Sequence, residues 1–198
     1  LARAGVESAA ATAIECGTNA WHSLGQSWEN NPGSFRGVPV GNAGTFSVIH
    51  PGATIDPHET NLVYGLADES ARINLNALPL DSMGCRILQT LLQSVGGLDA
   101  TRAAETAAAI IDWRDVSNTV FNAGQGVTGA ESDYYRGLTP PYACHDGPLD
   151  SLEELLLVRG IDATLLERIR GYLTVYGSNT IANINTADTT VLTALAQA

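Results

Sequence analysis

The chain has 198 residues and carries 21 aspartate and glutamate side chains against ten arginines and no lysine, for a formal net charge of −11. This acidic balance argues against a partner with a phosphate backbone, because binding to nucleic acid relies on clustered lysine and arginine side chains. It fits an exterior domain, a cation site or a basic protein partner. The length suits one domain, or one domain that carries an insertion.

The first 25 residues have the periodicity of a helix. Apolar side chains recur near one face at 3.6-residue spacing, namely Val6, Ala10, Ala13, Ile14, Trp21 and Leu24. The pattern begins at Leu1 without a capping residue, and residues 189–198 predict a second helix that stops equally abruptly. We therefore expect a fragment cut from a longer chain. The sequence contains no signal peptide and no run of 18 apolar residues, so we expect no membrane span within it.

Between these ends the pattern predicts loops, short strands and helices in turn. A loop rich in Gly, Asn and Pro covers residues 28–44. Short strands are expected at residues 44–50, 61–66 and 73–76, and helices at 82–115, 151–158 and 165–169. A β-hairpin is expected at residues 172–184, with its turn at 177–179.

One short phrase occurs twice, as Asn74-Leu-Asn76 and as Asn183-Ile-Asn185. Each copy is expected where a strand ends and a helix begins, because an Asn side chain can cap the first turn of a helix. The copies bracket a nearly all-helical segment of about one hundred residues, a size within the usual range for a domain. This indicates a helical module inserted into an α/β framework.

The three cysteines, Cys16, Cys85 and Cys144, are widely spaced and form no C-x-x-C motif, which argues against a zinc cluster. Two interpretations stay open. One is a Cys85–Cys144 disulfide, and the other is three buried thiols.

Two pairs of acidic residues stand out in the helical segment. Asp112 and Asp115 follow an apolar helix end, and Glu131 and Asp133 follow a Gly- and Asn-rich loop. Four hard oxygen donors from two short segments suit calcium. The alternative is a solvated loop start, although carboxylates are unfavourable at the negative end of a helix dipole, which favours a cation. The adjacent aromatic residues are expected to pack, partly buried, beneath the loop; they are Trp113, Tyr134 and Tyr135.

The sequence also bears on two other classes of function. Residues 152–169 have the pattern of a helix-hairpin-helix, which binds DNA phosphates through backbone amides. The acidic residues around Arg159, Arg168 and Arg170 favour a packing role instead, so a nucleic-acid-binding module is the alternative hypothesis. An enzyme is not expected, because the sequence has no nucleophile elbow, zinc-protease motif or phosphate loop.

The order of short phrases along the chain resembles the K-type minor pseudopilins of bacterial type II secretion systems, the GspK family. The phrases that carry the resemblance are Ala2–Ser8, Tyr64–Glu69, Ile73–Asn76, Ala108–Asp115, Gly129–Glu131 with Tyr134-Tyr135, Leu152–Leu155 with Gly160-Ile161, and Asn183–Ala187.

The resemblance implies an α+β fold with a long N-terminal helix packed on an antiparallel sheet and a large helical domain inserted between strands. The implied divisions are residues 1–76 for the helix and first strands, 77–171 for the insert, and 172–198 for the return hairpin and the start of a truncated helix. It further implies a membrane helix ahead of Leu1 and a C-terminal portion beyond Ala198.

The resemblance also implies a role and a cation. Members of the family cap the tip of a periplasmic pseudopilus together with I-type and J-type minor pseudopilins, and their helical domain binds calcium. Carried over by residue, the implied ligands for one or two calcium ions are Asp112, Asp115, Glu131 and Asp133, with Asn118 as an amide donor. Ser117 stands where the family has a further acidic residue, which makes the site conditional. Asp146 and Asp150 are weaker candidates for a second cation.

Overall fold

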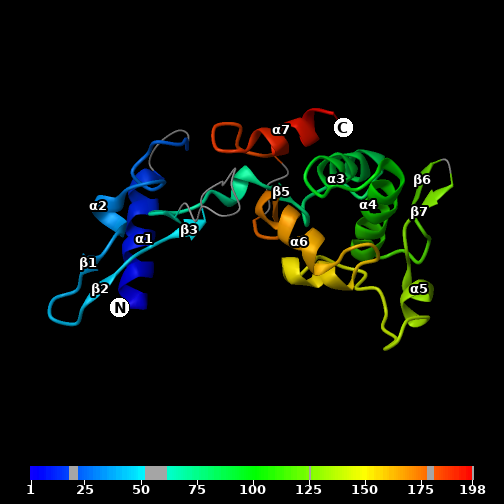
Figure 1. Cartoon of the computed structure of the whole chain (residues 1–198), viewed down its shortest axis with the longest axis horizontal. Coiled ribbons are helices and arrows are strands. Elements are labelled where there is room, and N and C mark those ends of the chain that lie inside the picture. Colours follow the sequence, from blue (N-terminus) through cyan, green and yellow to red (C-terminus); the bar gives the residue numbers. More distant parts are fainter. Residues whose placement is uncertain (18–21, 52–61, 125, 178–180, 198) are drawn as a thin grey trace. The chain divides into compact units, whose positions relative to one another are not determined.

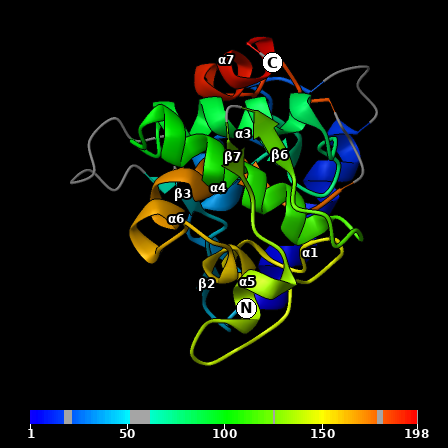
Figure 2. The same ribbon diagram turned by 90° about the vertical axis from the view of Figure 1, so that its right-hand side faces the viewer.

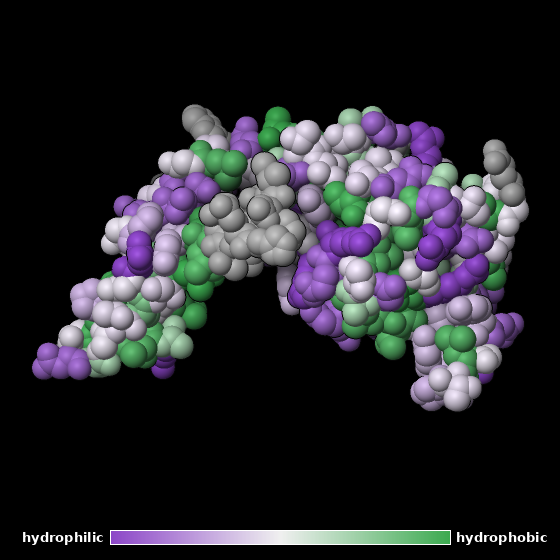
Figure 3. Space-filling model, viewed as in Figure 1, coloured by the Kyte–Doolittle hydropathy of each residue, from purple (hydrophilic) through white to green (hydrophobic). Residues whose placement is uncertain are grey.

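The computed structural model describes residues 1–17, 22–51, 62–124, 126–177 and 181–197, and the chain divides into two compact units, Leu1–Asp68 and Glu69–Ala198 (Figure 1). Both units combine helices with very short strands, which agrees with an α+β fold at the coarsest level. On the face seen in Figure 3, polar and apolar residues are interspersed. Among the described residues, no helix is long and apolar enough to cross a bilayer.

The first unit is built around one helix and two small antiparallel ladders. Its elements are α1 (Ala2–Cys16), α2 (Pro32–Phe35), β1 (Val38–Pro39) paired with β2 (Thr45–Phe46), and β3 (His50–Pro51) paired with β4 (Leu62–Val63). α1 packs on β2 at Gly5, where an added Cβ would lie 3.3 Å from the Phe46 ring.

The predicted helix over residues 1–25 is too long, because α1 ends at Cys16 with Gly17 as its C-cap. Glycine has the largest backbone entropy cost of the ordinary residues in a helix, and it favours a stop at this position. Residues 18–21 lie outside the described part, and residues 22–30 form turns and loop. The predicted apolar face is largely exposed rather than buried: Val6 is 69% and Ile14 75% exposed.

The second unit has a helical core. α3 (Ser82–Ser94) and α4 (Ala100–Arg114) lie side by side, and α7 (Thr189–Ala196) packs on α3 (Figure 2). Each helix begins at an aspartate whose carboxylate accepts backbone N–H bonds, namely Asp81, Asp99 and Asp188. The prediction of helix over residues 82–115 is confirmed, with a break between Ser94 and Ala100.

Shorter elements surround this core. They are η1 (Glu69–Ala71), β5 (Ile73–Asn74), β6 (Asn122–Gly124) paired with β7 (Val127–Thr128), α5 (Ser132–Arg136), η2 (Leu152–Leu157), α6 (Ala163–Ile169), η3 (Arg170–Tyr172) and β8 (Leu173–Thr174). The predicted helix at residues 151–158 is therefore a 3₁₀ helix, η2.

The predicted β-hairpin at residues 172–184 is wrong for the described residues. β8 pairs in parallel with β5, and residues 181–184 form no strand; residues 178–180 lie outside the described part. Parallel strands need a long crossover, and here residues 75–172 supply it. No single antiparallel sheet forms in the described chain, which has four separate two-stranded ladders. The insert boundaries of 77 and 171 stay a prediction.

The two Asn phrases adopt the same turn. Asn76 N–H donates to the Asn74 side-chain oxygen at 3.0 Å, and Asn185 N–H donates to that of Asn183 at 3.1 Å. Neither phrase caps a helix, because Asp81 and Asp188 do so farther along. The copies differ in their second Asn. The Asn76 side chain exchanges two hydrogen bonds with the Leu149 backbone and donates to the Val175 carbonyl, whereas Asn185 is exposed.

We expect Asn76→Ala to lower the free energy of unfolding by roughly 2–4 kcal/mol, because it leaves part-buried backbone groups of Leu149 and Val175 without partners. Asn185→Ala is the matched control and should change it by less than about 0.5 kcal/mol. Urea denaturation followed by circular dichroism measures both. Equal effects of the two substitutions would contradict the assigned role of Asn76.

Candidate metal centre

The last turn of α4 places a carboxylate inside the second unit. The Asp112 side chain is fully buried, and its Oδ1 accepts a hydrogen bond from the Phe121 backbone N–H at 2.7 Å. Its Oδ2 is buried without a hydrogen-bond partner among the described residues. The carboxylate also lies at the negative end of the helix dipole. Asp112 is therefore placed where a positive charge would be strongly favoured.

The β6–β7 ladder then brings Glu131 to the same place. Gly129 crosses α4 so closely that an added Cβ would clash with the Asp112 carboxylate and the Ala108 backbone. Two residues later Glu131 stands at the N-cap of α5, where it is only 4% exposed. Neither of its carboxylate oxygens has a hydrogen-bond partner within normal geometry in the described part of the chain.

Three of the five predicted ligands meet. Asp112, Asp115 and Glu131 each direct one carboxylate oxygen to within 4.8 Å of the others. Asp133 does not join them, because it is fully exposed and faces Arg136 at 3.7 Å. Asn118 is exposed. Ser117 is also exposed and donates its backbone N–H to Asp115 at 2.6 Å, so it closes a local turn.

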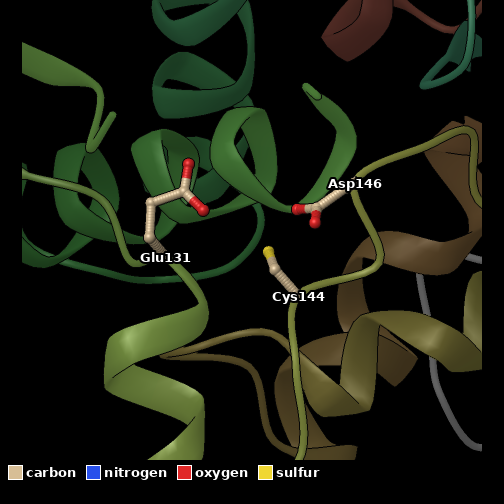
Figure 4. A group of neighbouring side chains, drawn as sticks. All are labelled: Glu131, Cys144 and Asp146. Atoms are coloured by element: carbon tan, nitrogen blue, oxygen red, sulfur yellow. The ribbon is translucent and has the colours of Figure 1, made fainter. Parts of the chain in front are cut away.

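A second group shares Glu131. One donor atom each from Glu131, Cys144 and Asp146 lies within 4.8 Å of the others, and Figure 4 shows the three side chains directed toward one another. Of the two weaker candidates, Asp146 thus lies beside the predicted ligands, whereas Asp150 is exposed and is not in either group. The sequence did not indicate Cys144 as a metal ligand. The one available signal was its position two residues before Asp146, a candidate cation ligand.

The loop that carries Cys144 and Asp146 is tied to the end of α4. The Asp146 N–H donates to the Trp113 carbonyl at 3.1 Å, and the Cys144 thiol approaches the Asp112 carbonyl at 3.6 Å. The Trp113 indole N–H donates to Glu154 at 2.8 Å, and His145 also bonds Glu154. These contacts fix the positions of the donor atoms through the backbone.

Aromatic rings pack behind the acidic groups. Trp113 and Tyr135 are buried and meet edge to face at 5.0 Å between centroids, and Tyr142 stacks on Tyr135 at 5.3 Å. The expectation of aromatic packing is confirmed for Trp113 and Tyr135. Tyr134 also meets Tyr135 edge to face at 5.1 Å between centroids, but it is 43% exposed and lies under the Arg159 guanidinium.

Burial and mutual repulsion make these groups hard to ionise. Burial first, and then the Asp115 charge, raise the pKa of Asp112 to about 6, although the hydrogen bond from Phe121 opposes the rise. Burial, followed by the charges of Asp112 and Asp115, raises the pKa of Glu131 to about 7, while the nearby Ser132 N–H opposes it. Burial raises the pKa of the Cys144 thiol to about 12. No salt bridge in the described chain neutralises Asp112, Asp115 or Glu131.

The donor set fits a hard divalent cation. Calcium takes six to eight oxygen ligands, including carboxylates that bind through one or both oxygens. Asp112 and Glu131 together offer three buried oxygens without partners, and Asp115 adds a further carboxylate. A cation would be bound by oxygens of this group and would offset the mutual repulsion of the carboxylates.

The three arginines of the helix-hairpin-helix pattern are engaged within the protein. Arg159 faces Glu105 at 3.5 Å and donates to the Gly129 carbonyl, Arg168 donates to the Gly96 carbonyl, and Arg170 pairs with Glu153 and Glu167. These contacts support the interpretation of residues 152–169 as packing architecture. The three cysteines are free and buried, so the Cys85–Cys144 disulfide is not formed.

Comparisons with known proteins point to one family. Residues 71–178 match the model of the family described as "Type II secretion system (T2SS), protein K". The chain is 25% identical over 167 residues to the type II secretion system protein K of Klebsiella pneumoniae, which covers 71% of this chain and 49% of that protein. It is 38% identical over 85 residues to the Aeromonas hydrophila protein of the same name, which covers 42% of this chain and 24% of the relative.

The fold has a solved counterpart. A chain of the GspK-GspI-GspJ complex from the enterotoxigenic Escherichia coli type 2 secretion system superposes with a TM-score of 0.72 and 21% identity, over 100% of this chain and 65% of that chain. This likeness concerns the fold. The chain described here spans about half the length of its Klebsiella relative.

The raised pKa values predict a pH dependence in chelated protein. The pKa values rise from 3.8 and 4.5 to about 6 and about 7, so the folded state holds more protons than the unfolded state between about pH 4 and pH 7. The free energy of unfolding should therefore fall as pH rises through this window. Relative to Asp112→Asn/Glu131→Gln, the wild type should lose on the order of 3 kcal/mol for each of the two carboxyls, because a pKa difference of one is worth about 1.4 kcal/mol.

Chemical denaturation in EDTA across this pH range measures the difference between wild type and the double variant. Asp133→Asn is the control and should keep the slope of the wild type, because Asp133 is exposed. A double variant whose pH slope equals that of the wild type would refute the assigned electrostatics.

Proposed function

Because the chain belongs to the type II secretion system protein K family, we propose that it is a minor pseudopilin that caps the tip of the periplasmic pseudopilus and helps to initiate its assembly and protein export. The observation that carries this proposal is the family match over residues 71–178, a range that includes α3, α4 and every acidic residue of the candidate metal centre. The role is structural rather than catalytic: the protein acts through its shape and its partners.

The proposed partners are the I-type and J-type minor pseudopilins, bound through the N-terminal helix and the strands beside it. The solved chain that superposes on this one comes from a complex of GspK with GspI and GspJ. α1 offers a suitable surface, because Val6 and Ile14 project apolar side chains into solvent from one face. A helix with such a face is stabilised by packing against another helix. In this proposal the folded part lies in the periplasm, on a protein anchored in the inner membrane.

Calcium is the proposed ligand of Asp112, Asp115 and Glu131. It would tie the β6–β7 ladder to the last turn of α4, two segments that meet where Gly129 crosses the helix. A ligand that binds only the folded state, at one hundred times its dissociation constant, stabilises that state by about 2.7 kcal/mol. In this proposal the cation supplies rigidity and takes part in no reaction.

We expect calcium to raise the melting temperature of the EDTA-treated chain by roughly 5 °C or more. Asp112→Ala/Glu131→Ala should abolish this response, because it removes the buried oxygens without partners. Asp133→Ala should keep the response, since Asp133 lies outside the group. Differential scanning calorimetry with calcium and with EDTA is the measurement. A wild-type melting temperature that calcium does not change would contradict the calcium assignment. So would a double variant whose melting temperature still rises with calcium.

Assembly is tested with the sister subunits from the same genome. We expect the chain to co-purify with the I-type and J-type minor pseudopilins, and Val6→Glu/Ile14→Glu to lower that recovery at least about tenfold, because the charges stand on the proposed contact face. Met83→Glu, at an exposed position of α3, is the matched control. Failure of the wild-type chain to co-purify with either subunit would count against the proposed function.

A further inference from the structure

A thiol lies inside the acidic cluster, and the proposed calcium ligands do not use it. Cys144 and Asp146 stand on the loop that follows α5, and both direct their donor atoms toward Glu131 (Figure 4). Cys144 is 7% exposed, and the Asp146 Oδ1 is buried without a hydrogen-bond partner in the described chain. The side chain of the neighbouring His145 bonds Glu154.

The unpartnered carboxylate of Glu131 is the second, independent sign of a ligand. Glu131 is more than nine-tenths buried, and both of its oxygens lack partners within normal geometry in the described chain. A buried carboxylate oxygen without a hydrogen bond costs more free energy than a buried neutral polar group without one. One of these oxygens can serve the hard cation and the other remains for a second ligand beside Cys144.

The chemistry of the donors selects the ligand. A thiolate with two carboxylates is a poor set for calcium, which takes oxygen, but it suits zinc and related divalent transition metals. Tetrahedral coordination at the usual bond lengths places donor atoms about 3.3–3.8 Å apart. The three donors already lie within 4.8 Å of one another, so a small contraction brings them to a metal ion.

We propose that Glu131, Cys144 and Asp146 form a binding site for a zinc-like divalent transition metal, distinct in its donors from the calcium group and joined to it through Glu131. The site supplies one sulfur and two oxygen ligands and leaves a fourth position to water. On binding, the Cys144 thiol loses its proton to solvent, and the sulfur–metal bond forms without any change of oxidation state. The inference goes beyond the proposed function and does not require it.

Cobalt(II) is the probe, because a cobalt–thiolate bond gives a sulfur-to-metal charge-transfer absorption in the near ultraviolet. We expect one equivalent of cobalt to produce this band in the reduced chain and zinc to displace the cobalt. Cys144→Ser should abolish the band, whereas Cys85→Ser, a matched change of another buried free thiol, should retain it. Asp146→Asn should keep the band and weaken metal affinity by roughly tenfold or more.

The outcomes separate this site from the calcium group. Cys144→Ser should retain the calcium-induced rise in melting temperature, and this also shows that the variant is folded. If that variant does not fold, the wild-type band and the weakened affinity of Asp146→Asn carry the test. Absence of the band in reduced wild-type protein, or a band that survives Cys144→Ser, would overturn the inference. A band in protein that shows no calcium response would leave this site standing and refute the calcium assignment alone.

Discussion

The structure of the second unit depends on how buried carboxylates are accommodated at the C-terminal end of α4. Asp112 and Glu131 are enclosed in the core region, repel one another, and have no ion-pair partner in the described chain. The surrounding elements converge on this point. The β6–β7 ladder crosses at Gly129, and the loop with Asp146 is hydrogen-bonded to the Trp113 carbonyl. A single cation or proton at this point therefore acts on three segments at once.

Sequence and resemblance together predicted those residues of the candidate metal centre whose positions depend on local structure. Asp112 and Asp115 stand at a helix end, and Glu131 stands at the start of α5, so their positions follow from where those helices end and begin. Asp133, which the resemblance groups with them, lies outside this cluster in the structure. It lies two positions beyond Glu131, and 100° of rotation per helical residue turns it to the opposite side. Cys144 was considered only as a disulfide partner, because its approach to the acidic residues depends on tertiary contacts with Asp112 and Ser132, which no spacing rule records.

The same division between local and distant interactions explains the fold. α3 and α4 were predictable because their apolar periodicity and capping aspartates agree. The β5–β8 ladder was not, since its two strands have two residues each and are about one hundred positions apart. The residues around Gly177 predicted a hairpin, but β8 pairs in parallel with the distant β5 instead. The twin Asn phrases show the same limit: they form identical turns, yet only Asn76 meets partners from a distant segment.

The two units divide the proposed function between them. The apolar face of α1 is on the first unit, and the buried carboxylates are on the second. Because the carboxylates destabilise the second unit unless a cation or a proton neutralises them, the stability of that unit is coupled to metal and pH. Partner binding and cation dependence can therefore be changed by separate substitutions. In the proposed function the acidic cluster sets how rigid the helical unit is, and the exposed face of α1 determines which subunits the protein joins.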